Sequence, residues 1–387
     1  MKGLLDDLEK SMPYIMSLRE YFHINAEAGG LENKTSKRII KELKKLKVDY
    51  EIINHYTVIA YINRDRKKKA IAFRTGIDGF EIMESEDNEY ISKNNQISHV
   101  SANDCNVASM LGIIKVLKEN EKKLNSKAIF IFESNSTLES SSTQIINSGL
   151  LDKIEYLYGT HLISYMNVNT YEAKSGYQLV GMNAIKIKWY GNNISTALND
   201  NKHDLIRAGS HFAFNIVGAI ANDIDSKKIY KVSMTEFKAG GYYNIIPDYC
   251  EMTLNIRFQD LETKKEIHRL ISEYLKVMEN RFGVKTKSYV INDVEPLCND
   301  EKAVAFVLDA IDKIKGNKII DDLNVKMLSE TLSNYAKKYK TSLIAVGSKS
   351  KDEDQDDFFT KDYFPKEDAI YSNAKIMMQL CIDYMVK

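Results

Sequence analysis

The feature that most constrains the fold is an alternation of strand and helix patterns that breaks near residue 180 and resumes after residue 288. Before the break, short apolar runs of the strand type alternate with segments whose apolar side chains recur at helical spacing. We predict strands at 57–62, 70–74, 128–132 and 156–161, and helices at 6–23, 35–47, 107–118 and 144–148. Such alternation favours a mostly parallel sheet covered by helices.

The segment 180–288 follows a different order of elements. We predict strands at 183–189, 231–236, 249–257 and 286–291, with helices at 205–223 and 261–280. This order, strand–helix–strand–strand–helix–strand, is the ferredoxin-like plan. A helix at 302–315, a strand at 342–346 and a helix at 367–386 follow. The sequence therefore predicts an α/β domain built from residues 1–179 and 289–387, interrupted by a smaller α+β insertion at residues 180–288.

Charge and composition exclude several classes of protein. The 54 Lys and Arg residues balance 54 Asp and Glu residues, which argues against a nucleic-acid binder with its usual basic excess. No apolar stretch approaches the ~18–20 residues that a membrane span needs, and the first residues lack the apolar core of a signal peptide. We expect a cytoplasmic protein, and the Lys-, Asn- and Ile-rich usage fits a bacterial one. Four cysteines without C-x-x-C spacing suggest neither a zinc knuckle nor a disulfide framework: Cys105, Cys250, Cys298 and Cys381.

A basic tract at residues 64–69 lies between the first two predicted strands. A cluster of lysines and arginines of this kind could bind phosphate. A solvated hairpin turn that joins the two strands is the interpretation that the pattern favours.

Local motifs along nearly the whole chain resemble the amidohydrolase branch of the aminoacylase-like metallopeptidases, which includes hippurate hydrolases and indole-acetyl-amino-acid hydrolases. Residues 73–79 (FRTGIDG) resemble the family's R-A-D-M-D-A, and residues 99–106 (HVSANDCN) stand where the family has H-A-C-G-H-D-G-H. Residues 132–137 (FESNST) correspond to F-Q-P-A-E-E, and residues 159–161 (GTH) to G-L-H. Residues 244–248 (NIIPD), followed by Arg257, resemble the N-V-I-P-D…R strand of the insertion. The resemblance implies a zinc-peptidase-like catalytic-type domain whose insertion serves as a lid and dimerisation domain.

The family chemistry uses two divalent metals, such as Zn²⁺ or Mn²⁺, that polarise the substrate carbonyl and activate a bridging water. A glutamate takes the proton from that water. Carried over residue by residue, the ligand and base positions are mostly substituted here. The thiolate position is Ser101, the first imidazole Asn103, the general base Ser136, the neighbouring carboxylate Thr137, the last imidazole Phe359, and the insertion-domain histidine Ser195. Of the family's ligands only His161 survives, so we expect no metal cofactor.

Four other positions of the family pattern are retained: Asp78, Asp104, Asn244 and Glu330, the last in residues 328–330 (LSE) where the family has G-G-E-D. In the family the counterpart of Asp78 supports a ligand histidine. Here the two aspartates could instead cap backbone N–H groups. Alternatively, Ser101, Asn103, Ser136 and Thr137 could hydrogen-bond to buried carboxylates, so that a neutral polar network fills the former metal cavity. His161 would then be an ordinary core histidine.

A new nucleophile is a further alternative. The fold would place Cys105 and Ser136 near His161 and Asp78, which are the ingredients of a Cys-His-Asp or Ser-His-Asp arrangement. Against this, Cys105 opens a helical pattern, where a small side chain is commonly buried, and the chain lacks a G-x-S-x-G elbow.

These substitutions predict a pseudo-enzyme that binds a small polar ligand or a protein partner. The alternative is a residual or altered hydrolase of N-acyl amino acids, with Asp78, Asp104, Glu330 and His161 assembling a reduced metal site. A pure scaffold is the third class. The resemblance also implies a homodimer formed through the insertion domain. Five apolar residues of the segment 205–223 could serve that interface or pack on the insertion's own sheet: Phe212, Phe214, Ile216, Val217 and Ile220.

Overall fold

The computed structural model describes residues 2–94, 96–151, 153–192, 194–196, 203–314, 316–320, 327–350 and 358–386. The chain divides into two compact units. Unit 1 contains the described residues of 1–178, 298–324 and 331–387, and unit 2 contains those of 179–297 and 325–330. None of the helices in the described part of the chain is long and apolar enough to cross a lipid bilayer.

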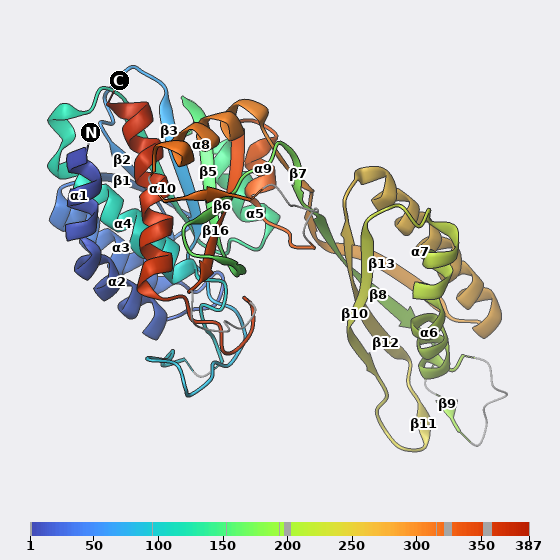
Figure 1. The fold of residues 1–387 in the computed structure, drawn as a ribbon. Coiled ribbons are helices and arrows are strands. Elements are labelled where there is room, and N and C mark those ends of the chain that lie inside the picture. The colour runs from blue at the N-terminus through green and yellow to red at the C-terminus, as the bar shows by residue number, and fades with distance from the viewer. Residues whose placement is uncertain are drawn as a thin grey trace. The chain divides into compact units, whose positions relative to one another are not determined.

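Unit 1 is built on a sheet of eight strands in the order β1-β2-β4-β3-β5-β16-β6-β15 (Figure 1). The strands are β1 (Asp49–Ile53), β2 (Thr57–Ile62), β3 (Ala70–Gly76), β4 (Lys127–Glu133), β5 (Ile154–Asn167), β6 (Thr170–Glu172), β15 (Lys318–Ile319) and β16 (Lys340–Lys349). The central strands β4, β3, β5 and β16 are parallel to one another, whereas β1–β2, β2–β4 and β16–β6 are antiparallel. The α/β prediction is confirmed, with a sheet that is mixed at its edges.

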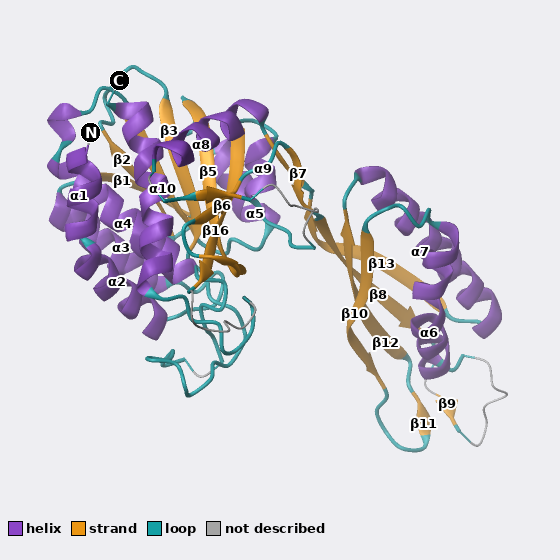
Figure 2. Ribbon diagram, in the orientation of Figure 1, coloured by secondary structure: helices purple, strands orange, loops and turns teal. Residues whose placement is uncertain are grey.

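Helices cover both faces of this sheet (Figure 2). The main apolar core lies beneath α1 (Lys2–Lys10), α2 (Met12–Ile24), α3 (Asn33–Leu46), α4 (Asn103–Glu119), α8 (Glu301–Lys313) and α10 (Glu367–Met385). Tyr158 points into that core, and because side chains alternate along a strand, Gly159 faces the other side. There Gly159 lies against Leu332 of α9 (Leu332–Ala336), which packs with α5 (Glu139–Asn147).

Two local predictions for unit 1 are wrong. The predicted helix 6–23 is divided into α1 and α2 at Ser11, just before Pro13, whose ring cannot continue a helix from the preceding turn. The basic tract 64–69 is not a hairpin turn, because β4 lies between the strands that it connects. Two of its charges have partners of their own: Arg64 pairs with Glu51, and Arg66 donates to the Leu124 carbonyl.

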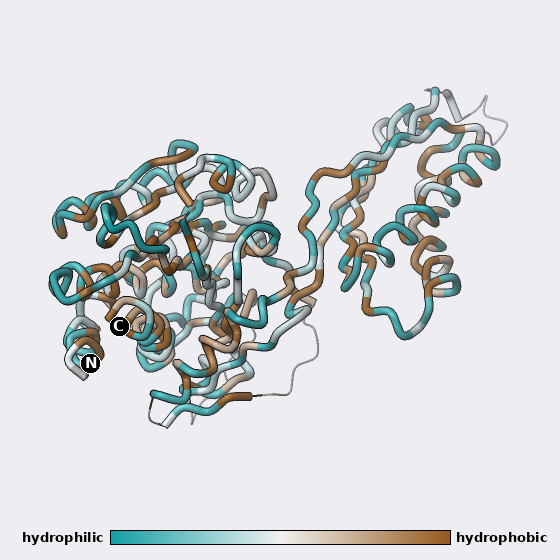
Figure 3. Tube along the Cα trace, turned by 90° about the horizontal axis from the view of Figure 1, so that it is seen from above, coloured by the Kyte–Doolittle hydropathy of each residue, from teal (hydrophilic) through white to brown (hydrophobic). Residues whose placement is uncertain are grey.

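Unit 2 has the predicted ferredoxin-like order. Its four strands form a sheet in the order β10-β12-β8-β13, and two helices pack on that sheet. The elements are β8 (Gly181–Tyr190), α6 (Leu205–Asp223), β10 (Tyr230–Ala239), β12 (Tyr249–Phe258), α7 (Leu261–Phe282) and β13 (Lys285–Val294). Both helices alternate hydrophobic and hydrophilic segments along their length, as expected of helices with one buried face (Figure 3). Two small sheets complete the fold, β9 (Ile194–Ser195) with β11 (Ile245–Ile246) and β7 (Gly176–Leu179) with β14 (Leu297–Asn299).

The apolar residues of α6 divide between two roles. Phe212, Ile216 and Ile220 are fully buried in the core of unit 2. Phe214, in contrast, is 87% exposed, and Val217 is 46% exposed. The first three residues therefore pack on the unit's own sheet, and only the last two are accessible to another molecule.

Candidate functional site

The candidate site of unit 1 lies where the central strands end. Strands β3 and β4 are parallel and in register, with Gly76 opposite Glu133. Their carboxyl ends therefore meet at the same edge of the sheet, which is the usual place for ligand sites in open α/β sheets. Asp78 follows β3 at this edge, and Ser136 follows β4.

Ser136 and Asp78 are joined directly. The Ser136 hydroxyl donates to Asp78 Oδ1 over 2.5 Å, and Asn103 Nδ2 donates to the Asp78 carbonyl over 2.9 Å. A Cβ atom at Gly76 would come within 2.3 Å of Ser136 Oγ, so the serine occupies the space that a side chain at residue 76 would need. Asp78 is 2% exposed; burial raises the pKa of its carboxyl to about 6, and the hydrogen bond from Ser136 partly opposes that shift.

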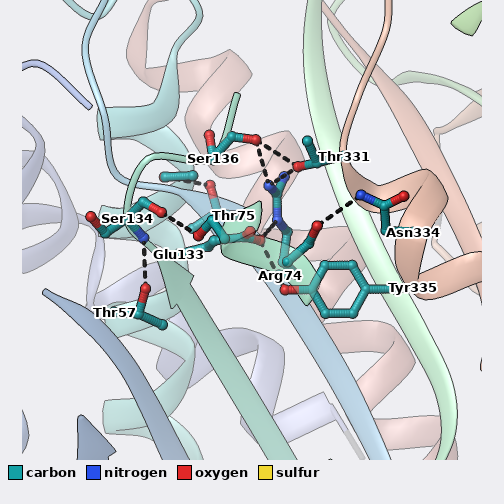
Figure 4. Close-up of polar contacts among 12 residues, drawn as sticks. Thr57, Arg74, Thr75, Glu133, Ser134, Ser136, Thr331, Asn334 and Tyr335 are labelled. Carbon is teal, nitrogen blue, oxygen red and sulfur yellow. Dashed lines mark hydrogen bonds and ion pairs between the residues drawn. The ribbon is translucent and has the colours of Figure 1, made fainter. Parts of the chain in front are cut away.

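A buried ion pair holds the turn that carries Ser136 (Figure 4). Arg74 Nε donates to Glu133 Oε2 over 2.6 Å, and Tyr335 donates to the same oxygen over 2.9 Å. On the other side of its guanidinium, Arg74 donates to Thr331 Oγ1, which in turn donates to the Ser136 carbonyl over 2.6 Å. The side chains of Arg74 and Glu133 are almost fully buried, so each charge needs the opposite charge of the other to offset its loss of hydration. The sequence signal for this pair was a charged residue inside each of two buried strands, and sequence reasoning missed it.

Glu32 supports the same turn from a third segment. Its carboxylate accepts hydrogen bonds of 2.6 Å from the Ser134 hydroxyl and from the Asn135 backbone N–H. Asn135 has a φ of 52°, a left-handed conformation that asparagine tolerates better than most residues. The position of Ser136 is therefore set by contacts from Glu32, from Arg74 and from Thr331, in addition to its own hydrogen bond to Asp78.

Three further residues of the family motif lie near the start of α4. Ser101 is buried, and its Oγ has no hydrogen-bond partner in the described part of the chain. The same holds for both ring nitrogens of His99, and burial lowers the pKa of that imidazole to about 4. Phe359 reaches this segment from the C-terminal side, where its backbone N–H donates to the Val100 carbonyl over 2.9 Å. Its ring packs against Phe80 with 5.0 Å between ring centroids.

Asp104 does not cap a helix. The N-cap of α4 is Ala102, and no side chain caps this helix end. Asp104 Oδ2 instead lies 3.2 Å from Arg19 Nε and 2.8 Å from His23 Nδ1. Burial opposes the charge of Asp104, but His23 and Arg19 more than compensate and hold its pKa well below the ordinary range.

This geometry does not support Cys105 or Ser136 as a nucleophile. Cys105 is fully buried, and burial together with the neighbouring Asp104 raises the pKa of its thiol well above the ordinary value. A reactive cysteine needs the opposite shift. Ser136 donates its proton directly to a carboxylate, whereas a serine nucleophile donates to an imidazole.

The remaining predicted residues are placed as follows. His161 is half-buried in β5, opposite Ala345 of β16, and Thr137 is exposed. In unit 2, Ser195 lies in β9, and the exposed Asn244 accepts a hydrogen bond from Thr196 N, so these two positions are close together. Glu330 is half-buried in unit 2. Its neighbour Ser329 accepts a 2.6 Å hydrogen bond from Arg257, which pairs with no carboxylate among the described residues.

The donor set does not fit a pair of divalent cations. Zn²⁺ and Mn²⁺ prefer thiolate, imidazole and carboxylate ligands, which neutralise their charge. The family positions here offer two hydroxyls, an amide and a phenyl ring beside one imidazole. The Asn103 amide and the Ser136 hydroxyl are also already engaged with Asp78. No group of three or more His, Cys, Asp or Glu side chains in the described part of the chain could hold a metal ion.

Comparison with known proteins finds one matching family model and several related sequences. Residues 165–281 match the model of the M20 peptidase dimerisation domain. The chain is 26% identical to an N-acetyl-L-cysteine deacetylase of Bacillus subtilis over 80% of this chain and 74% of that protein. It is 24% identical to an IAA-amino acid hydrolase of Arabidopsis thaliana over 87% and 78%.

Two solved structures share the fold of the chain. An aminohydrolase from methicillin-resistant Staphylococcus aureus superposes with a TM-score of 0.87 at 22% identity, covering 99% of both chains. A Bacillus subtilis protein described as a dinuclear metal binding peptidase from the M20 family superposes with a TM-score of 0.77 at 19% identity, covering 97% of this chain and 98% of that one.

Proposed function

Because this chain belongs to the M20 peptidase and amidohydrolase family, we propose that it binds a small polar molecule at the family's site and has lost di-metal hydrolysis. One observation carries this proposal. The side chain at the general-base position, Ser136, is a hydroxyl whose proton is donated to a buried carboxylate. A hydroxyl in this role can neither accept a proton from water near neutral pH nor neutralise a metal dication.

The chemistry of unit 1 favours an uncharged polar ligand group. Among the described residues near the strand ends, the buried polar groups without a hydrogen-bond partner include the Ser101 hydroxyl and the His99 imidazole, whose pKa burial lowers. Such groups exchange hydrogen bonds with an amide or a hydroxyl. An amide of the N-acyl amino acid type, the class named for the relatives, has this character.

Unit 2 contributes a separate anion-binding group. Arg257 is a partly buried cation that hydrogen-bonds to Ser329 and Asn255 and to no described carboxylate. Burial lowers the pKa of its guanidinium, which indicates an uncompensated charge. We propose that Arg257 binds a carboxylate, because a guanidinium matches the geometry of a carboxylate.

A residual hydrolase is the second candidate. It is favoured by the names of the relatives, a deacetylase and an amino acid hydrolase. This function would need Asp78, Asp104, Glu330 and His161 to assemble a single metal site. Against it, both Asp78 and Asp104 are already committed to protein partners.

A homodimer in the cytoplasm belongs to the same proposal. The match to a dimerisation domain supports the dimer, and Phe214 on α6 supplies an exposed aromatic side chain in the matched segment. Exposed aromatic residues are typical of the centres of protein interfaces.

The test measures binding and turnover of hippurate (N-benzoylglycine) by calorimetry and chromatography, in chelator and with added Mn²⁺. We expect binding in chelator, no hydrolysis in either condition, and at least about tenfold weaker binding by Arg257→Gln. Arg281→Gln, at an exposed arginine of the same unit, is the matched control and should bind like the wild type. Hydrolysis that chelator abolishes would establish the second candidate instead, and absence of binding would refute the ligand proposal.

A further inference from the structure

A buried group of charges joins α2, α4 and the segment between β3 and α4. His23 has a carboxylate oxygen close to each ring nitrogen. Asp104 Oδ2 is hydrogen-bonded to Nδ1 over 2.8 Å, and Glu84 Oε1 lies 2.6 Å from Nε2 at ion-pair distance, without the alignment of a hydrogen bond. Arg19 pairs with Asp104 on one side and donates to the Tyr90 hydroxyl on the other. The side chains of Arg19, His23, Glu84 and Asp104 are each at most 3% exposed.

This geometry favours a doubly protonated His23. A neutral imidazole has one N–H and one lone pair, so it can donate to only one of the two carboxylates. The other carboxylate oxygen would then face a lone pair at hydrogen-bond distance, in a place that water does not reach. With both nitrogens protonated, the two cations Arg19 and His23 balance the two anions Asp104 and Glu84. Burial disfavours this charge, but Asp104 and Glu84 outweigh burial and raise the pKa of His23.

Among the residues that the structure describes, none supplies a second cation at His23 that could replace it. The titratable and charged groups that face it or its partners are Arg19 on α2, Asp104 and Cys105 on α4, Glu84, Tyr90 and His99 in the segment between β3 and α4, and Tyr363. Of these only Arg19 is cationic, and it is already used by Asp104 and stacked 3.8 Å from the centre of the Phe364 ring. His99 has its own pKa lowered by burial, to about 4.

Glu84 and Tyr90 belong to a loop whose two ends are joined by backbone hydrogen bonds. Phe80 and Ser98 form its neck, with backbone hydrogen bonds of 2.8 and 2.9 Å in both directions. The neck begins two residues after Asp78 and ends three residues before Ser101, so the loop stands beside the candidate site. The Phe80 ring also packs on Phe359, at the family's last ligand position.

We propose that His23, held as an imidazolium between Asp104 and Glu84, docks the loop segment 80–94 onto unit 1 and so positions the rim of the candidate site. His23 is therefore a positioning residue rather than a proton carrier. This inference does not depend on the proposed function, because it concerns only the charges that hold the loop.

The first test is spectroscopic. In histidine-selectively ¹⁵N-labelled protein at pH 7.5, both ring nitrogens of His23 should show the shifts of protonated nitrogens, with the signal assigned by its loss in His23→Gln. His268 is the internal control, because burial lowers its pKa and its Nε2 lies 2.9 Å from Asn183 Oδ1. A neutral His23 at this pH would overturn the proposal.

The second test is hydrogen exchange of the loop amides by mass spectrometry. Glu84→Gln keeps the shape of the side chain and removes its charge, and it should speed exchange of residues 84–94 by at least about tenfold. Glu86→Gln, at an exposed position of the same loop, should leave exchange unchanged. Exchange in β4 and α10 should be the same in all three proteins. Unchanged exchange in the loop, or equal acceleration throughout unit 1, would refute docking by His23, whether or not His23→Gln folds.

Discussion

Ser136 donates its hydroxyl to Asp78 across 2.5 Å, between segments that are 58 residues apart in the chain. The contact fills the space above Gly76. If Ser136 stands at the family's general-base position, as we propose, a hydroxyl–carboxylate pair replaces a carboxylate that is free to take a proton.

Replacing Asp78 with Asn should change stability in a pH-dependent way. Burial raises the pKa of Asp78 from 3.8 to about 6, so the folded state binds this proton more tightly than the unfolded state does. The carboxyl is therefore most favourable to folding below pH 3.8, and its contribution falls as the pH rises to about 6 and then stays constant. Two pKa units correspond to about 3 kcal/mol, so Asp78→Asn should raise the melting temperature at pH 8.

Thermal unfolding at pH 8 and at pH 5 checks this expectation. The rise in melting temperature caused by Asp78→Asn should be larger at pH 8 than at pH 5, because more of the wild-type carboxyl is already protonated at pH 5. Equal destabilisation at both pH values would contradict the burial argument.

Gly76→Ala should destabilise the protein by about 1–3 kcal/mol through overpacking. The new Cβ would lie 2.3 Å from Ser136 Oγ and 2.9 Å from Asp78 Oδ1. Adding Ser136→Gly to the same chain should recover most of the loss, because it removes the colliding atoms. Gly218→Ala on α6 is the control, since a Cβ there meets nothing within 4 Å. Urea unfolding of the four proteins measures these differences in the free energy of unfolding. An unchanged free energy of unfolding in Gly76→Ala would show that the space beside Gly76 can accept a methyl group.

Arg74→Met should destabilise unit 1 by about 3–5 kcal/mol, because it leaves the Glu133 charge buried without its cation. Arg64→Met breaks an exposed pair, with 39% and 40% of the two side chains exposed, and should cost about 1 kcal/mol or less. Chemical denaturation of both variants provides the comparison. Similar losses in the two variants would mean that the Arg74–Glu133 pair is not the anchor of the Ser136 turn.

Phe214→Asp should weaken the proposed dimer by at least about tenfold in dissociation constant, because it places a charge in an apolar contact. Leu31→Asp is the matched control, at a leucine of unit 1 that is 67% exposed. Sedimentation velocity over a range of concentrations distinguishes the outcomes. A monomeric wild type, or a dimer whose dissociation constant Phe214→Asp leaves unchanged, would exclude α6 as the interface.

Much of the fold follows from local sequence patterns, because apolar periodicity directly reports which face of an element is buried. The ferredoxin-like order of unit 2 was predictable for this reason. Which strands become neighbours is a different question: β4 lies between β2 and β3, and nothing in the pattern of residues 57–74 indicates that insertion.

The same limit applies to the site. The motif positions of Asp78 and Ser136 could be read from the chain, but their direct hydrogen bond could not. The partners of Asp104 are 81 and 85 residues away on α2, and Glu84 lies in a loop without any periodicity. Pairing between distant charged residues depends on tertiary packing, which a single sequence does not display.

The most direct test of the central claim is metal content. The protein is purified without chelator, dialysed against Zn²⁺ and Mn²⁺, freed of excess metal, and analysed by plasma mass spectrometry. The account predicts a metal content near zero per chain, with hippurate binding unaffected by the dialysis. One or two tightly held ions per chain would contradict it, and would show that the substituted positions still ligate metal.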